Sequence, residues 1–394
     1  MSSAVAAVVL SDDKISPDGA FGSRAPSIHL YHPLPNLLQM SAPEILQSYR
    51  CSQASDFAAA FDRLRSNGST GNLSSAISLL DRYLAAYPND ALRHRLTTDS
   101  LHTLFKEMHD HVMAHPVWVH PFFVRFATGE FTKDQLRIFS QQYFNQVKNT
   151  RQCVALALGR FHTLLNRPDG HLNNALSELT QIVLAGLLAD EYGVSTHSSH
   201  GTPGNDTSPP GEGSVDVADI FAPVTHAALY RRFLDLLNTG VDGYDVPLLH
   251  SVADNVLVQR ILAGDPAYSH MEALASVGLG MEWGVPAFFS MLIAGILKSA
   301  QYQEMPDPAA MEIWTAHVHQ DVVHAVAVMI VTSFFIRDAD DITRVKNATN
   351  ALMAFRYEMM SDIYRAVFAA PCTRIDEIDL EKVYLVEDRR LPEL

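Results

Sequence analysis

The sequence AHVHQDVVHAVAVMIV, residues 316–331, is the stretch on which the interpretation of the fold depends. It places His317, Asp321 and His324 at positions i, i+4 and i+7 of a predicted helix. At about 100° per residue these three side chains project from one stripe, whereas His319 lies on the opposite face and is left out. Imidazole and carboxylate donors that converge in this way form a three-point metal claw, so the stretch predicts part of a metal site.

The alternative is a helix whose histidines are ordinary surface or core residues. The apolar run that follows His324 disfavours it, because it indicates a buried helix. Buried polar side chains need partners, and one cation would satisfy all three.

Helical periodicity recurs over most of the chain, and no series of short period-two runs interrupts it. After a turn at Thr128 and Gly129, Thr132 is the predicted N-cap of a long amphipathic helix. Further helical patterns cover about residues 172–192, 225–238, 246–263, 265–278, 282–299, 307–335 and 338–369. The sequence therefore predicts an all-α fold, a helical bundle rather than a solenoid.

Composition shifts divide the chain into segments. Residues 1–40 are rich in Gly, Ser and Pro and predict a flexible N-terminal arm, and residues 41–94 predict an accessory helical segment that docks on the main body or forms a homodimer contact. Residues 95–370 form the main domain, and residues 371–394 form a C-terminal tail. Within the domain, residues from about 194 to 222 predict a disordered insertion or a lid.

The overall composition excludes several classes of protein. The 394 residues include 29 Lys and Arg but 44 Asp and Glu, and this excess of negative charge disfavours nucleic acid as a partner. The three cysteines are far apart and predict neither a disulfide framework nor a thiolate zinc site. Without a signal-peptide pattern or an uninterrupted apolar stretch of membrane length, we expect a cytoplasmic protein with no membrane partner.

Other predicted helices supply further donors for a metal site. Glu282 is an isolated acid in an apolar segment, where burial without a partner is costly; the alternative is exposure at a helix start. Asp190 and Glu191 end another apolar helix, where the helix dipole opposes acids unless a cation compensates. His226 falls in the first turn of the next helix and could equally be a capping or core residue.

In this order, the motifs LLADEYG, HAALYRRFL, G-x-E-x-x-V-P-x-F-F and HxxxDxxH resemble those of the haem-oxygenase-like diiron oxidases and oxygenases, whose fold is shared with the TenA thiaminases. The less specific segment FVRFATGEFTKDQLRIFSQQY is similar to their first core helix, and the resemblance covers about residues 100–370. It implies a haem-oxygenase-like bundle that binds two irons through Glu191, His226, Glu282, His317, Asp321 and His324.

One departure from the family pattern concerns the second ligand. The family has only a few residues between the acid and the next histidine, whereas about 34 separate Glu191 from His226. His197 and His200 are closer in sequence, but neither precedes the A-L-Y-R-R-F pattern. We assign His226 and keep His197 and His200 as alternatives.

The expected chemistry follows from these ligands and from the resemblance. Three carboxylates and three imidazoles without a thiolate suit iron or manganese. The resemblance implies an enzyme that uses O₂, with or without an external reductant, on a small amino-acid-like, carboxylate or amine substrate, with N-oxygenation or oxidative C–C or C–N chemistry in specialised metabolism. A carboxylate substrate would need a cation, and the candidates are Lys148, Arg151 and either Arg231 or Arg232.

Two other classes of function remain open. A TenA-like, metal-independent hydrolase would use a cysteine nucleophile, but Cys153 has no nearby acid in the sequence. A non-enzymatic helical interaction protein would use residues 41–87 as a docking module and would bind no metal.

Overall fold

The computed structural model describes residues 36–50, 98–161, 170–194, 223–304 and 306–378, together with residues 82, 85 and 86. Within these ranges helices are the only regular secondary structure, which confirms the predicted all-α fold. The predicted insertion, with His197 and His200, and most of the arm, the accessory segment and the C-terminal tail lie outside the described residues.

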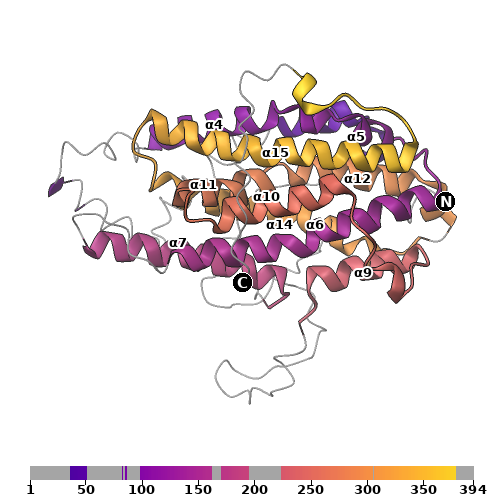
Figure 1. Ribbon diagram of the computed structural model, residues 1–394, viewed down its shortest axis with the longest axis horizontal. Helices are drawn as coiled ribbons and strands as arrows, with labels where there is room; N and C mark the ends of the chain where they lie inside the picture. Colours follow the sequence, from indigo (N-terminus) through magenta and orange to yellow (C-terminus); the bar gives the residue numbers. More distant parts are fainter. Residues whose placement is uncertain are drawn as a thin grey trace, which may run out of the picture.

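The described helices form a bundle with its long helices side by side (Figure 1). In the view of Figure 1, α4 and α15 lie along the top, α7 and α9 lie along the bottom, and α6, α10, α12 and α14 lie between them. The helix α14 contacts α7, α9, α11 and α12, so it runs through the middle of the bundle. The bounds are α4 Thr98–Met113, α5 Pro121–Phe126, α6 Lys133–Arg160, α7 Gly170–Glu191, α9 His226–Leu236, α10 His250–Gly264, α11 His270–Ala275, α12 Val285–Lys298, α13 Ala300–Glu304, α14 Glu312–Ser333 and α15 Ala339–Phe368.

The start of α6 follows the sequence prediction. Gly129 adopts a φ of 78° in the preceding turn, a left-handed conformation that glycine tolerates. Thr132 is the N-cap: its hydroxyl accepts from the Gln135 backbone N–H, and the Gln135 side chain accepts from the Thr132 N–H at 2.8 Å. This capping box satisfies two backbone donors at the first turn of the helix.

The run from α11 to α12 differs from the prediction of two separate helices. A π-helical segment, Ser276–Glu282, joins them, and the Trp283 N–H donates to the Gly278 carbonyl at 3.0 Å. Glu282 is therefore not exposed at a helix start but buried within a continuous helical run. This run, His270–Lys298, is long and apolar enough to cross a membrane, but its apolar window is entirely buried inside the bundle.

The described part of the N-terminal region, residues 36–50, packs on the bundle. The Tyr49 hydroxyl lies 2.6 Å from the Ser290 hydroxyl of α12, and the Arg50 guanidinium donates to the Met113 carbonyl. Leu37, in the short 3-10 helix Leu37–Gln39, is buried as well. The packed chain thus begins before residue 41, the boundary predicted for the flexible arm.

Candidate metal centre

Six buried side chains gather in two groups of three at the centre of the bundle. Within each group, one donor atom from each residue lies within 4.8 Å of the others. The first group, here called triad A, is Glu191, His226 and His317; the second, triad B, is Glu282, Asp321 and His324. These are the six residues predicted as ligands from the sequence.

The α14 stripe contributes to both triads rather than to one claw. His317 belongs to triad A, whereas Asp321 and His324 belong to triad B. A helix rises about 1.5 Å per residue, so His317 and His324 are separated by about 10 Å along α14. That spacing is too long for one ion, and the stripe therefore faces two candidate ion positions.

Triad A joins chain segments that are distant in sequence. Glu191 ends α7 and His226 begins α9, and the His226 Nδ1 lies 3.3 Å from the Glu191 Oε2. The two flanking segments touch: Gly193 has a φ of 67°, and a Cβ atom there would lie only 2.2 Å from the Val224 carbonyl oxygen. The end of α7 and the start of α9 therefore lie side by side, which reconciles the long spacing in sequence with the short distance.

Hydrogen bonds orient the two outer histidines of α14. One nitrogen of His317, Nδ1, donates to the Ile313 carbonyl at 2.6 Å, which leaves Nε2 with a lone pair. The Nε2 of His324 lies 2.6 Å from the Asp190 carboxylate, and its Nδ1 lies 3.8 Å from the Glu282 carboxylate. A metal-binding histidine commonly donates its second N–H to a carbonyl or carboxylate in this way.

The electrostatics of the cluster reflect carboxylates and imidazoles crowded in a buried space. Burial and the neighbouring Glu282 and Glu191 raise the pKa of Asp321 well above its usual range. For Glu191, burial alone would raise the pKa, but His226 and the other imidazoles outweigh it and the pKa is lowered. Burial opposes the charge of His324, but Asp190 and Glu282 outweigh it and raise its pKa to about 9.

The donor set fits two divalent metal ions. It provides three imidazoles and three carboxylates with no thiolate, the combination preferred by iron and manganese. The His226 Nδ1 is buried and forms no hydrogen bond of good geometry, so this atom remains available to bind a metal ion. Four carboxylates, counting Asp190, would balance the charge of two divalent ions.

A small cavity of about 20 Å³ adjoins the centre. Glu191, His317, Glu282 and Asp321 line it, and Tyr143, Gln146, Thr150 and Arg356 complete its polar lining. Neither the pairing of Asp190 with His324 nor the presence of Arg356 beside the triads was predicted from the sequence. The acid pair at the end of α7 was a signal for Asp190, whereas nothing in the sequence near Arg356 indicates that it faces this cavity.

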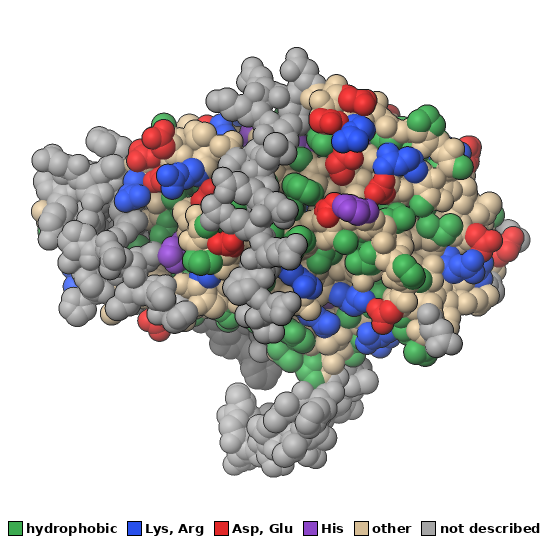
Figure 2. Space-filling model, in the orientation of Figure 1, with side chains coloured by type: hydrophobic (Ala, Val, Ile, Leu, Met, Phe, Trp, Pro, Cys, Tyr) green, Lys and Arg blue, Asp and Glu red, His purple; other side chains and the backbone are tan. Residues whose placement is uncertain are grey.

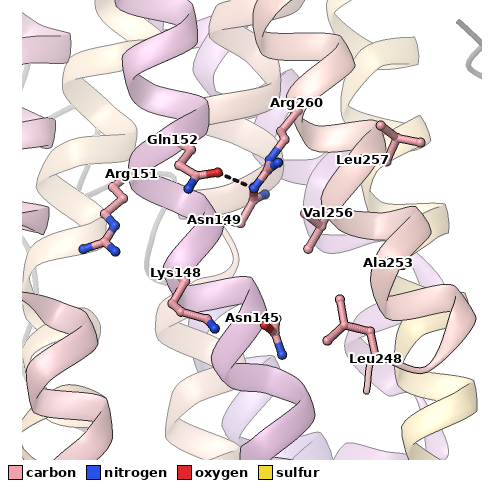
Figure 3. Close-up of a pocket in the computed structure, with 10 residues that line it drawn as sticks. All are labelled: Asn145, Lys148, Asn149, Arg151, Gln152, Leu248, Ala253, Val256, Leu257 and Arg260. Carbon is pink, nitrogen blue, oxygen red and sulfur yellow. Dashed lines mark hydrogen bonds between the residues drawn. The ribbon is translucent and has the colours of Figure 1, made fainter. Parts of the chain in front are cut away.

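The structure does not bring the predicted substrate cations to this cavity. Lys148 and Arg151 line a different cleft, of about 450 Å³, between α6 and α10 (Figure 3), and Lys148 pairs with Asp245 at 2.7 Å. Arg151 lies over the Tyr192 ring at 5.3 Å, and Arg232 pairs with Glu312 at 3.2 Å. The reason is helical phase: Lys148 and Arg151 leave α6 on another face than Tyr143, Gln146 and Thr150.

The outer surface carries both signs of charge. On the face shown in Figure 2, Lys and Arg side chains are intermixed with Asp and Glu. Arg231, the other predicted alternative, is partly exposed on α9.

Cys153 is poorly suited to act as a nucleophile. Its side chain is buried, and its Sγ accepts a hydrogen bond from the Asn149 amide at 3.3 Å. Burial raises its pKa to about 12, so the thiol stays protonated near neutral pH.

Comparison with known proteins gives one informative similarity. No protein-family model matches the chain. The chain is 24% identical over 249 residues to a protein named 4-aminobenzoate synthase from Nitrosomonas europaea, a match that covers 60% of this chain and 82% of that protein. The name of this distant relative suggests an enzyme with a biosynthetic role.

Proposed function

We propose that this protein is a non-haem diiron enzyme of the haem-oxygenase-like group, which uses O₂ to oxidise a small substrate bearing a carboxylate or an amine. The observation that carries the proposal is the gathering of six buried donors in two triads from four separate helical segments. Such a cluster is costly to bury without cations, because carboxylates and imidazoles that lack partners lose their hydration.

The chain's own residues would hold and orient the metal ions. In triad A, the His317 Nε2 and the Glu191 and His226 side chains are free to bind one ion, and the Ile313 carbonyl keeps His317 in the required tautomer. In triad B, Asp190 fixes His324 so that its Nδ1 faces Glu282 and Asp321. When bound, two ferrous ions would supply two electrons for the reduction of O₂.

The substrate class rests on the distant relative as well as on the resemblance in sequence. The relative's name, 4-aminobenzoate synthase, describes the formation of a small aromatic acid that also carries an amine. We propose a substrate or product of this general kind for the present chain, as a carboxylate or amine of comparable size.

Neither alternative class accounts for the buried cluster. A TenA-like hydrolase needs an activated nucleophile, and the raised pKa of Cys153 does not provide one. A non-enzymatic helical interaction protein gives no reason for two triads of metal-binding side chains in the core.

The proposal is tested by measuring how many Fe(II) ions are oxidised for each O₂ molecule consumed. Protein loaded with Fe(II) without oxygen and then exposed to limiting O₂ should oxidise about two Fe(II) per O₂ consumed, as expected when one O₂ takes two electrons from one pair of irons. An oxygen electrode and a ferrous chelator give the two numbers. His317→Ala should lose this stoichiometry, whereas His250→Ala should keep it, because His250 forms an exposed helical pair with Asp254. Oxidation at the rate of free Fe(II) in buffer would contradict the proposal.

A further inference from the structure

Arg356, on α15, is a buried cation to which the described residues offer neither an ion pair nor a hydrogen bond. Its side chain is 1% exposed, and its Nε and Nη1 atoms form no hydrogen bond. No carboxylate among the described residues forms an ion pair with it, and its guanidinium carbon lies 5.9 Å from the centre of the Trp118 ring. Yet Arg356 lines the small cavity beside the two triads.

A guanidinium in this position needs an anion. Arginine does not lose its proton in proteins, so a buried and unpaired side chain keeps its charge, and the loss of its hydration is unfavourable. The acids that line the same cavity, Glu191, Glu282 and Asp321, belong to the two triads and would be occupied by metal ions. Four carboxylates balance two divalent ions, so among the described residues the charge of Arg356 remains uncompensated beside the loaded centre.

The shape of the site favours a carboxylate as that anion. The cavity of about 20 Å³ is too small for a whole ring, so it takes only the polar end of a ligand. A guanidinium presents two parallel N–H donors, which match the two oxygens of a planar carboxylate. Gln146 and Thr150 line the same cavity, but the Gln146 amide already donates to Gln259 at 3.0 Å and the Thr150 hydroxyl to the Gln146 carbonyl at 3.3 Å, which leaves the guanidinium as the unused donor group.

We infer that Arg356 is the residue that anchors the carboxylate of the substrate beside the metal centre. The inference rests on the proposed function, because the acids of the unloaded centre would repel an anion and the metal ions remove that repulsion. It also replaces Lys148, Arg151 and Arg232 as the substrate cation, since those three side chains lie elsewhere.

The test compares acetate with acetamide, two probes of nearly equal shape that differ in charge. The protein is loaded with Zn(II), a diamagnetic ion that accepts the same nitrogen and oxygen donors, and its metal content is measured. Binding is then followed by saturation-transfer NMR of the probe's methyl protons. Arg356→Gln removes the charge, and Arg356→Lys keeps the charge but removes the two parallel N–H donors. Arg137→Gln is the control, because it alters the exposed Arg137–Asp134 pair.

We expect the loaded wild-type protein to bind acetate and not acetamide, and the unloaded protein to bind acetate more weakly. Arg356→Gln should weaken acetate binding about 10- to 100-fold, the loss typical of one charge-assisted hydrogen-bonding partner, with Arg356→Lys between it and the wild type. Arg137→Gln should match the wild type, and all variants should hold the same amount of Zn(II).

Three results would overturn the inference. Equal acetate affinity in the wild type and both Arg356 variants, at equal metal content, would show that the anion binds elsewhere and would leave the metal centre intact. Equal binding of acetate and acetamide by the wild type would exclude a charge-selective site even if Arg356→Gln fails to fold. A protein that takes up no metal would instead refute the proposed function, and the inference with it.

Discussion

His115 and His120 are buried histidines outside the candidate metal centre, and each caps a short helix. The His115 Nδ1 accepts from the Val117 N–H at 3.1 Å, and the His120 Nδ1 accepts from the Phe122 N–H at 3.0 Å. Burial, followed by the nearby Arg365, lowers the pKa of His120 to about 3. Burial, followed by His111 and Arg356, lowers the pKa of His115 to about 3 as well. Both imidazoles are therefore neutral in the folded protein.

The pKa shift of His120 predicts acid sensitivity. Because the folded pKa lies below the unfolded value of about 6.5, the unfolded chain binds the extra proton, and stability falls as the pH drops from about 6.5 towards 3. His120→Asn keeps a capping acceptor but removes the titration. Between pH 7.5 and 5, the wild type should lose about 2 kcal/mol more of its free energy of unfolding than this variant.

Urea unfolding at several pH values measures this difference. His250→Asn is the control, because the His250 side chain is 90% exposed and lies outside the core. Parallel stability curves for the wild type and His120→Asn would show that His120 is protonated in the folded state, contrary to this account.

Single residues were predictable where chemistry and spacing combine. His317, Asp321 and His324 could be placed on one stripe because a helix has a fixed period. Arg356 could not be predicted to face the centre, because α15 is a helix of 30 residues on which neither spacing nor composition marks which neighbour lies opposite each position. Lys148 and Arg151 show the converse: their charge could be read from the sequence, but not that their phase on α6 places them at a cleft other than the one beside the triads.

The π-helical segment between α11 and α12 places Glu282 in triad B. One residue more per turn shifts the phase of the side chains that follow, and such segments are frequent at functional sites. Gly278 allows α14 to approach, because a Cβ atom there would lie 2.6 Å from the Val328 Cγ1. Close packing of this segment against α14 brings Glu282 to the residues of the stripe.

Gly278→Ala should destabilise the protein by about 1–3 kcal/mol, because Val328 is a stiff, β-branched residue that cannot move aside. Gly186→Ala, in α7, is the matched control: no atom lies within 4 Å of the added Cβ, so alanine should stabilise the helix by about 0.5–1 kcal/mol. Chemical denaturation of both variants measures the two effects. The same sign for both substitutions would contradict the close approach of α14.

At the element scale, most helices could be predicted from their periodicity, but the π-helical segment could not. Nearly all residues from Met271 to Leu297 are apolar and buried. In such a run, apolar and polar residues do not alternate in a way that shows the number of residues per turn, so the sequence does not reveal the extra residue of a π-helical turn. The capping box of Thr132 and Gln135, by contrast, is a local signal that the sequence displays in full.

At the scale of the whole molecule, the end of α7 and the start of α9 lie next to each other although about 34 residues separate Glu191 from His226. Gly193 and Val224 contact each other through their backbones, and Glu191 and His226 meet just inside that contact. Sequence spacing alone could not show this, because it says nothing about where the two ends of a long connection lie. The spatial proximity of the ends favours His226 as the ligand.

Deleting residues 198–218 should therefore leave the free energy of unfolding within about 1 kcal/mol of the wild type, since the entropy of loop closure depends only logarithmically on length. The deletion variant should also retain its metal content, because Glu191 and His226 stay in place. Thermal and urea unfolding test the first expectation, and metal analysis tests the second. A large loss of stability would mean that the removed residues pack against the bundle.

The most direct test of a two-ion centre is the iron content of the purified protein and of one variant per triad. After anaerobic reconstitution with Fe(II) and removal of free metal, the wild type should hold about two Fe(II) per chain, one for each triad. His226→Ala, in triad A, and Asp321→Ala, in triad B, should each lose at least one ion while the helical circular-dichroism signal is retained, and His250→Ala should hold as much as the wild type. Equal iron content in the wild type and both triad variants, or no bound iron in any of them, would contradict the account.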